Sequence, residues 1–303
     1  MSELAIELSQ VTKRFGPKVA VNTVSLAVPR GQVYGLIGPN GAGKTTAFSM
    51  MCGFLHPTSG TLKVMGVAPT TPGGLKGKLG ALPQDAILPP GWEVGELLTY
   101  WARLSGLGQP QREAREALEK VGLIESWATP TEALSHGMAK RTAMAQALMG
   151  QPPLVLLDEP TAGLDPRVAG QVRQLIRDMK GQQTVLVSSH NLQELEELCD
   201  AAAILDRGTL VKAGTMAELT GQGAEFRVQI ARGEIIPPEL TQLPGVTDAK
   251  MESPGVLLVR FDGQAHKPEE VISRTVAHLL QTGVLILGVT RGQKLEERVL
   301  QIL

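Results

Sequence analysis

The chain has 303 residues, which is long enough for one full α/β domain and a second, smaller domain. Its 43% hydrophobic and 19% charged residues are typical of a globular protein and exclude a disordered or fibrous chain. The 29 basic and 30 acidic side chains leave a net charge of −1, which argues against a nucleic acid as the main partner.

The sequence also bears on the compartment of the protein. Cys52 and Cys199 form neither a pairing framework nor a CxxC motif, so we expect buried thiols in a reducing, cytoplasmic setting. The N-terminus lacks the basic and apolar stretches of a signal peptide. No window approaches the roughly 20 apolar residues that a membrane-spanning helix needs. A role at a membrane would therefore require another polypeptide.

The first part of the chain predicts a strand-rich segment followed by a helical one. The N-terminal segment predicts β-structure that ends at the turn Pro29–Gly31. A short apolar strand at residues 33–37 leads into a glycine-rich loop, and a helix follows from about Lys44 to Gly53. Residues from about 93 to 148 predict a helical subdomain. One face of its first helix carries Leu97, Leu98, Trp101 and Leu104.

Strands and helices then alternate. The apolar run Leu154–Leu157 is typical of a strand that is buried on both faces of a parallel sheet. The elements expected after it are a helix at about 167–180, a strand at 184–188, a helix at 192–199 and a strand at 203–205. This alternation predicts an α/β fold with a wound parallel sheet.

The composition changes at residues 221–223, and we place a domain boundary between residues 222 and 223. Beyond it the sequence predicts strands at 226–230, 246–251, 256–261 and 284–289, and helices at 238–243, 268–283 and 294–303. Pro268 is a favourable helix start, and Gly283 is a favourable helix end. The order β-α-β-β-α-β suggests that residues 223–303 form a small α+β domain of the ferredoxin-like type.

A phosphate-binding loop is the strongest chemical signal in the chain. The pattern G-x-x-x-x-G-K-[ST] is matched by Gly38, Pro39, Asn40, Gly41, Ala42, Gly43, Lys44, Thr45 and Thr46. The glycines let backbone N–H groups turn toward a polyphosphate, and the following helix adds the positive end of its dipole. We expect Lys44 to reach the β- and γ-phosphates and the Thr45 hydroxyl to bind Mg²⁺.

Two acidic residues, Asp158 and Glu159, close the buried strand at 154–157. Wound sheets bind nucleotides at the carboxyl ends of such strands. We expect Asp158 to hold Mg²⁺ and Glu159 to be the general base that polarises water for attack on the γ-phosphate. Together with the phosphate loop, this pair predicts a P-loop nucleoside triphosphatase.

Further motifs follow in order: Leu82-Pro83-Gln84-Asp85, Leu134-Ser135-His136-Gly137-Met138, Gly163-Leu164-Asp165 and His190. With them, residues 1–222 resemble the nucleotide-binding domain of ABC transporters. The resemblance implies ATP and Mg²⁺ as cofactors, and a fold that adds antiparallel β and helical subdomains to the parallel sheet. It also implies that Gln84 senses Mg²⁺ and the attacking water.

The resemblance assigns roles at a dimer interface as well. Ser135, His136, Gly137 and Met138 take the place of the family's signature, usually LSGGQ, which completes the ATP site of the opposing subunit. His136 and Met138 depart from that pattern, whereas Ser135 can still cap a helix that runs to about Leu148.

Three more positions match family motifs. Asp165 matches the D-loop, which crosses the dimer interface, and His190 matches the histidine that contacts the γ-phosphate. Phe15 matches the aromatic residue that stacks on adenine, although it could equally be a packing residue.

The implied assembly is a homodimer, or a heterodimer with a similar ATPase, that clamps two ATP molecules head to tail. A separate membrane-spanning permease would bind a groove of the helical subdomain around Leu97–Trp101, or that face would pack within the subdomain. The chain would then lie in the cytoplasm on the inner face of the cell membrane. The C-terminal unit, including Lys294–Leu300, resembles the extension of type-2 exporter ATPases that move drugs, lipids, sodium or polysaccharides.

Two other readings share the phosphate loop. A soluble ABC ATPase could act on ribosomes, DNA or cofactor assembly, but ribosomal members usually carry two cassettes and DNA-repair members carry long coiled coils. This chain has one phosphate loop and no extended heptad run. A nucleotide kinase would have no use for Ser135, Asp165 and His190 in this order.

Overall fold

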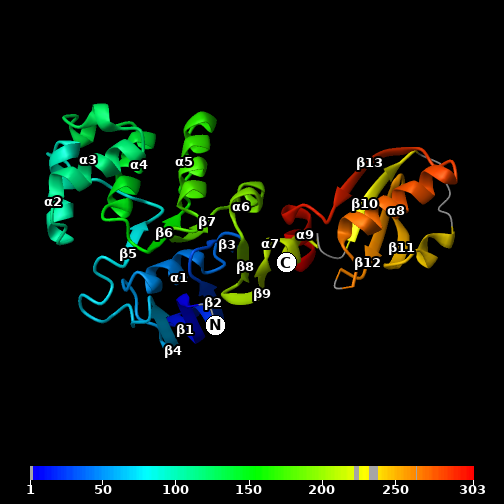
Figure 1. Ribbon diagram of the computed structural model, residues 1–303. Coiled ribbons are helices and arrows are strands. Elements are labelled where there is room, and N and C mark those ends of the chain that lie inside the picture. The colour runs from blue at the N-terminus through cyan, green and yellow to red at the C-terminus, as the bar shows by residue number, and fades with distance from the viewer. Residues whose placement is uncertain (1–2, 222–224, 232–237, 264) are drawn as a thin grey trace. The chain divides into compact units, whose positions relative to one another are not determined.

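The computed structural model describes residues 3–221, 225–231, 238–263 and 265–303. The chain divides into two compact units, Met1–Gly214 and Thr215–Ile302, whose elements are labelled in Figure 1. The predicted boundary at residues 222 and 223 lies outside the described residues. In the described part of the chain, no helix combines the length and the apolarity that crossing a membrane requires.

A mostly parallel sheet organises the first unit, with strand order β5-β6-β7-β3-β8-β9. The strands are β3 (Val33–Ile37), β5 (Leu79–Leu82), β6 (Leu154–Asp158), β7 (Thr184–Ser188), β8 (Ala201–Asp206) and β9 (Thr209–Thr215). Strands β5 to β8 of this order pair in parallel. Every residue of β3, β6 and β7 is buried, as expected for strands covered on both faces. The predicted wound sheet is confirmed.

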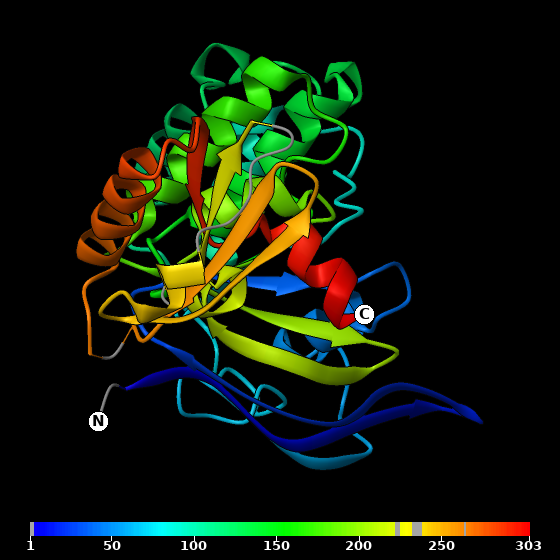
Figure 2. The same ribbon diagram turned by 90° about the vertical axis from the view of Figure 1, so that its right-hand side faces the viewer.

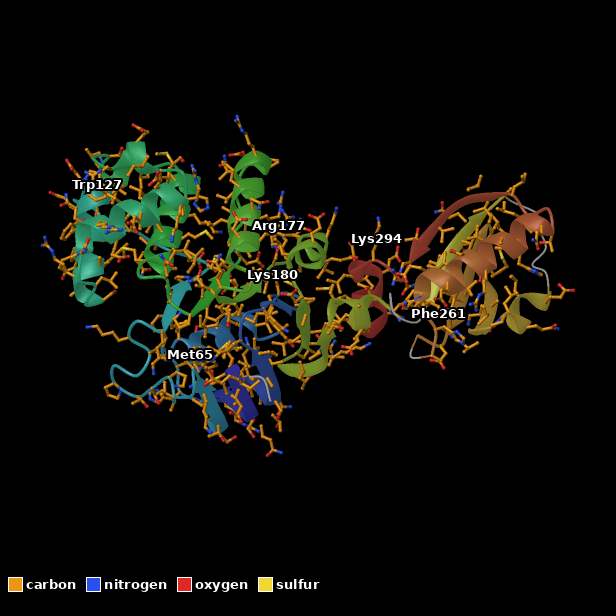
Figure 3. The ribbon with its side chains drawn as sticks, in the orientation of Figure 1. Met65, Trp127, Arg177, Lys180, Phe261 and Lys294 are labelled. Atoms are coloured by element: carbon orange, nitrogen blue, oxygen red, sulfur yellow. The ribbon has the colours of Figure 1, made fainter. Side chains whose placement is uncertain are left out.

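A second, antiparallel sheet has the order β2-β1-β4. Its strands are β1 (Leu4–Phe15), β2 (Lys18–Pro29) and β4 (Ser59–Val64). Apolar side chains from both sheets and from helix α1 (Lys44–Met51) share one core, which includes Ile6, Met50 and Met65. Of these three residues, Figure 3 labels Met65. This shared core holds α1, and the loop before it, in a fixed position relative to both sheets.

The segment expected to form a helical subdomain is helical. It comprises α2 (Val94–Leu104), α3 (Pro110–Lys120) and α4 (His136–Leu148), with 3₁₀ turns at Ile124–Ser126 and Thr131–Ala133. Leu97 and Leu98 are buried, but Leu104 is 59% exposed, so the predicted apolar face is wrong at its last position. The reason is local, because α2 ends at Leu104. Helices α5 (Pro166–Met179) and α6 (Leu192–Leu198) pack next to β7 and β3.

The second unit is built on an antiparallel sheet with the order β11-β12-β10-β13. Its strands are β10 (Glu225–Ile230), β11 (Val246–Ser253), β12 (Val256–Phe261) and β13 (Ile286–Arg291), and its helices are α7 (Met216–Thr220), α8 (Pro268–Gln281) and α9 (Leu295–Ile302). Helix α8 covers one face of this sheet (Figure 2), and the core between them includes Phe226, Phe261, Val271 and Leu279. The first expected helix is a 3₁₀-helix, Pro238–Gln242.

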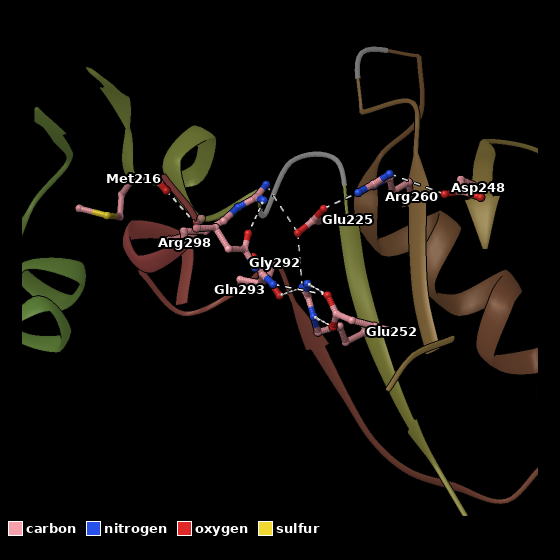
Figure 4. Close-up of polar contacts among 11 residues, drawn as sticks. Met216, Glu225, Asp248, Glu252, Arg260, Gly292, Gln293 and Arg298 are labelled. Carbon is pink, nitrogen blue, oxygen red and sulfur yellow. Dashed lines mark hydrogen bonds and ion pairs between the residues drawn. The ribbon is translucent and has the colours of Figure 1, made fainter. Parts of the chain in front are cut away.

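A charged network also stabilises the second unit (Figure 4). Arg227 of β10 donates hydrogen bonds of 2.6 and 2.7 Å to the carboxylate of Glu252, and one of 2.6 Å to the carbonyl oxygen of Gly292. Glu225 lies 3.7 Å from both Arg260 and Arg298, which connects α9 to the sheet. The Arg227 side chain is only 11% exposed, so this network acts in a partly desolvated place.

Candidate nucleotide site

A cleft of about 500 Å³ opens where β3 and β6 end. Its lining residues are Lys18, Ala20, Asn40, Gly41, Ala42, Gly43, Lys44, Thr45, Thr46, Gln84, Asp158, Glu159, Ala162 and His190. Most of the residues that the sequence singles out for nucleotide chemistry are therefore brought together, although they come from segments far apart in the chain.

The glycine loop depends on backbone geometry that other residues avoid. Gly41 and Gly43 are in the left-handed region, with φ of 83° and 100°. A Cβ atom at Gly43 would overlap the carbonyl oxygen of Ala20, and one at Gly38 would overlap that of Leu205. Helix α1 starts directly after the loop, without a side-chain cap. Its first N–H groups are thus available to an anion, which is the arrangement of a phosphate site.

Lys44 supplies the positive charge of this loop. Its side chain is largely buried, and Nζ donates hydrogen bonds to the carbonyl oxygens of Gly38 (2.6 Å) and Pro39 (3.2 Å). Burial lowers the pKa of Lys44, whereas the nearby carboxylates of Glu159 and Asp158 raise it. The ammonium group is therefore held at the cleft wall, where a bound polyphosphate would replace part of the solvation it has lost.

Asp158, at the end of β6, is buried beside two hydroxyl groups. Its carboxylate accepts hydrogen bonds from the hydroxyls of Ser188 and Thr45. Burial raises the pKa of Asp158, and the hydrogen bonds from Ser188 and Thr45 act in the opposite direction. The carboxylate and the Thr45 hydroxyl are hard oxygen donors at the same end of the cleft, so they fit Mg²⁺.

Glu159 has an unusual backbone conformation for a non-glycine residue, with φ of 51°. Its N–H group donates to the Ser188 hydroxyl (3.0 Å) and to the Ser188 carbonyl oxygen (3.2 Å). Oε2 of Glu159 lies 2.8 Å from Nδ1 of His190. A carboxylate held this way, next to an exposed imidazole at a phosphate cleft, is placed to take a proton from water. Backbone strain of this kind is concentrated at functional sites.

Other expected residues do not line this cleft in the described part of the chain. Ser135 is the N-cap of α4 and accepts a 3.3 Å hydrogen bond from the N–H group of Met138, which confirms the expected cap. Asp165 caps α5 through the N–H groups of Arg167 and Val168. Phe15 is 47% exposed at the end of β1, with the Lys13 ammonium 5.1 Å above its ring.

Sequence reasoning missed four residues of the site: Lys18, Ala20, Ala162 and Ser188. Ser188 is the most informative, because the parallel pairing of β6 with β7 places it opposite Asp158. The available signal was a serine that directly follows the apolar run Val185–Val187. Its partner becomes apparent only once the two strands are placed side by side.

A second cleft, of about 580 Å³, lies beside α2 in the helical subdomain. Its lining residues are Trp92, Glu93, Gly95, Glu96, Thr99, Tyr100, Arg103, Gln111 and Trp127. Thr99 and Tyr100, which belong to the range Leu97–Trp101 where we expect a groove, line this cleft, whereas Leu97 is buried in the subdomain. The rings of Trp92 and Tyr100 lie 5.3 Å apart, and the Arg115 guanidinium stacks 4.1 Å from the ring of Trp127. Figure 3 labels Trp127 in the helical subdomain.

The sheet, the glycine loop and the buried acidic pair define a P-loop nucleoside triphosphatase. The family model for "ABC transporter" matches residues 21–162. The chain is 31% identical to the linearmycin resistance ATP-binding protein LnrL of Bacillus subtilis, over 90% of this chain and 89% of that protein. It is 32% identical to the Nod factor export ATP-binding protein I of Ralstonia nicotianae, over 91% and 87%. The chain therefore belongs to the ATP-binding subunits of ABC transporters, and it is an ATPase.

Solved structures support the same fold. A structure of an ATP-binding subunit of an ABC transporter has a TM-score of 0.67 and 26% identity, over 73% of this chain and 93% of that one. A dimeric ATP-binding cassette in a post-hydrolysis state, bound to ADP and Pi, has a TM-score of 0.64 at 24% identity, over 70% of this chain and 98% of that one.

Proposed function

We propose that the chain is one half of an ATP-dependent dimer that drives export through a separate membrane-spanning subunit. The observation that carries this proposal is the 2.8 Å contact between Glu159 and His190 at the cleft that also contains Lys44. This contact joins a proton acceptor to a group that can reach the γ-phosphate. Relatives named for drug resistance and for export support the direction of transport.

Within the cleft, the loop Gly38–Thr46 binds the ATP phosphates, and Lys44 contacts the β- and γ-phosphates. Thr45, Gln84 and Asp158 hold Mg²⁺, which neutralises charge on the phosphate oxygens when it is bound. Glu159 orients and deprotonates the attacking water, and His190 contacts the γ-phosphate. The cleft geometry supports these roles, because all the named side chains line it or belong to its loop.

The residues that lie outside the cleft support the proposed dimer. Helix α4 begins at Ser135 with no acidic residue in its first turn, so its N–H groups can receive an anion. We assign Ser135 to Met138 to the ATP that is bound by the opposing subunit, and Asp165 to the interface between the subunits. Phe15 stacks on adenine from the rim. The partner is a second copy of this chain or a similar ATPase.

The membrane partner is a permease that inserts a cytosolic helix into the cleft beside α2. Trp92 and Tyr100 offer apolar rings there, while Glu96 and Arg103 offer charges of both signs. This docking holds the ATPase on the inner face of the membrane. Relatives that cover most of the chain are named for resistance and for export, so a soluble ATPase of ribosomes or DNA is not favoured.

The test is the Glu159→Gln variant. The ATPase rate should fall by about 10²- to 10⁴-fold, because the amide cannot accept the proton of water. ATP binding should persist, and light scattering after size exclusion should show an ATP-dependent dimer. Adding Ser135→Arg should abolish this dimer without weakening ATP binding. A Glu159→Gln variant that hydrolyses ATP at the wild-type rate would remove the assignment of the base.

A further inference from the structure

The first turn of α4 lies against the segment Glu159–Asp165 of the same chain. A Cβ atom on Gly163 would be 3.1 Å from Nε2 of His136, and one on Gly137 would be 3.2 Å from Cδ2 of Leu164. Glycine at both positions therefore allows a close approach of helix and loop. The start of α4, which is assigned to the partner's ATP, therefore contacts the segment that begins with the catalytic carboxylate Glu159.

Lys140 adds a hydrogen bond to this contact between α4 and the segment Glu159–Asp165. Its side chain is buried, with 6% of the residue exposed, and Nζ donates a 2.9 Å hydrogen bond to the carbonyl oxygen of Ala162. Ala162 in turn donates its N–H group to the carbonyl oxygen of Glu159 at 3.2 Å. A short chain of hydrogen bonds therefore runs from α4 to the backbone of Glu159.

Burying the Lys140 ammonium group costs desolvation free energy. This cost argues that the positive charge has a role in the site. Burial lowers the pKa of Lys140, whereas Glu159, Asp158, Asp85 and Glu194 raise it through their charges. An apolar side chain of similar length would fill the same space without that cost. What such a side chain would lack is the hydrogen bond to Ala162 and a positive charge near the two acidic residues of the cleft.

We propose that Lys140 is a positioning residue of the ATPase, which ties the first turn of α4 to the segment Glu159–Asp165. Each chain offers the start of α4 to its partner's ATP. Because of this tie, the start of α4 moves as one body with Glu159, the water-activating carboxylate of the same chain. This inference rests on the proposed function, since it needs α4 to meet the partner's nucleotide. Its consequence is that closure around one ATP adjusts the carboxylate at the other.

The first experiment separates positioning from folding. Lys140→Met should lower kcat by about 10- to 100-fold with KM for ATP changed less than about threefold, because a misplaced general base affects the chemical step. Lys140→Arg, which keeps the charge and the donors, should recover part of the loss. The matched control is Arg141→Met, because Arg141 also donates to a carbonyl oxygen (Val121, 3.1 Å) but on the side of α3. Equal losses of kcat in both Met variants at equal melting temperature would overturn the proposal.

Mixed dimers of full-length chains, purified through two different tags, show in which chain of the dimer Lys140 acts. Pairing a Lys140→Met chain with a Glu159→Gln chain leaves one active carboxylate, which lies in the chain without Lys140. Placing both substitutions in one chain and pairing it with wild type leaves the active carboxylate beside an intact Lys140. We expect the first dimer to be at least about tenfold slower than the second, as for a misplaced catalytic group.

The outcomes distinguish the two proposals. If the second mixed dimer is the slower one, Lys140 acts through the partner's site and the tie to Ala162 is not its function. If both are equally fast, the inference fails while the dimer stands. If Glu159→Gln chains do not dimerise with ATP at all, the proposed function itself fails.

Discussion

At the scale of single residues, Ser188 organises the acidic pair. Its hydroxyl donates to Asp158 and accepts the N–H group of Glu159, so one side chain fixes both the metal-binding and the water-activating residue. The hydroxyl is fully buried, which gives its hydrogen bonds more weight than they would have in water. Ser188 can contact both acidic residues because the register of β6 and β7 pairs it with Asp158.

Replacing Ser188 by Ala should therefore impair catalysis more than folding. We expect kcat to fall by about tenfold, the effect of losing roughly 1.4 kcal/mol of hydrogen bonding at the site. A suitable control is Thr184→Val at the other end of β7, which removes a hydroxyl bonded to the N–H group of Gly31. Steady-state kinetics of both variants should show a loss for Ser188→Ala only. Similar rates in the two variants would mean that Ser188 does not organise the site.

At the scale of elements, the sequence predicts best those structures whose defining residues are adjacent in the chain. The phosphate loop could be predicted because Gly43 and Lys44 carry its backbone and its charge within two consecutive positions. Strand β9 was not predicted, because a largely exposed edge strand shows no apolar alternation. The expected helix at 238–243 is a 3₁₀-helix, since so short a segment does not distinguish the two hydrogen-bond patterns.

Replacing two glycines by alanine tests how backbone conformation specifies helices. We expect the two substitutions to change the free energy of unfolding in opposite directions. Gly283 ends α8 with φ of 84°, and a Cβ atom there would meet nothing within 4 Å, so Gly283→Ala introduces backbone strain alone. This should lower the free energy of unfolding by about 1 kcal/mol. Gly170 lies inside α5, where a Cβ atom would meet only the Arg173 side chain at 3.7 Å. Gly170→Ala should raise the free energy of unfolding by about 0.5–1 kcal/mol.

Urea denaturation followed by circular dichroism measures both effects. The two variants serve as controls for each other, because each adds the same methyl group, one inside a helix and one directly after a helix end. If both changed stability in the same direction, backbone conformation would not be the cause.

At the scale of the whole molecule, the chain has two independent sources of stability. The first unit has a core shared by two sheets and α1, and the nucleotide cleft belongs entirely to it. The second unit has its own core around Phe226 and Phe261, together with the charged network of Arg227. Since the ligand site and the charged network lie in different units, each offers a way to stabilise or weaken one unit alone.

Calorimetry of the full chain should therefore show two unfolding transitions that respond separately. In the Glu159→Gln variant, MgATP at about 100 times its Kd should stabilise the first unit by about 2.7 kcal/mol and raise its transition by roughly 5–10 °C. Arg227→Met removes both hydrogen bonds to Glu252 and one of the three arginines beside Glu225, which should cost the second unit about 2–3 kcal/mol. Arg274→Met breaks the exposed pair with Glu270 and a long, exposed hydrogen bond to the carbonyl oxygen of Pro244 (3.4 Å), and it should cost less than about 1 kcal/mol. A single transition that MgATP and Arg227→Met both shift would show that the two units unfold as one.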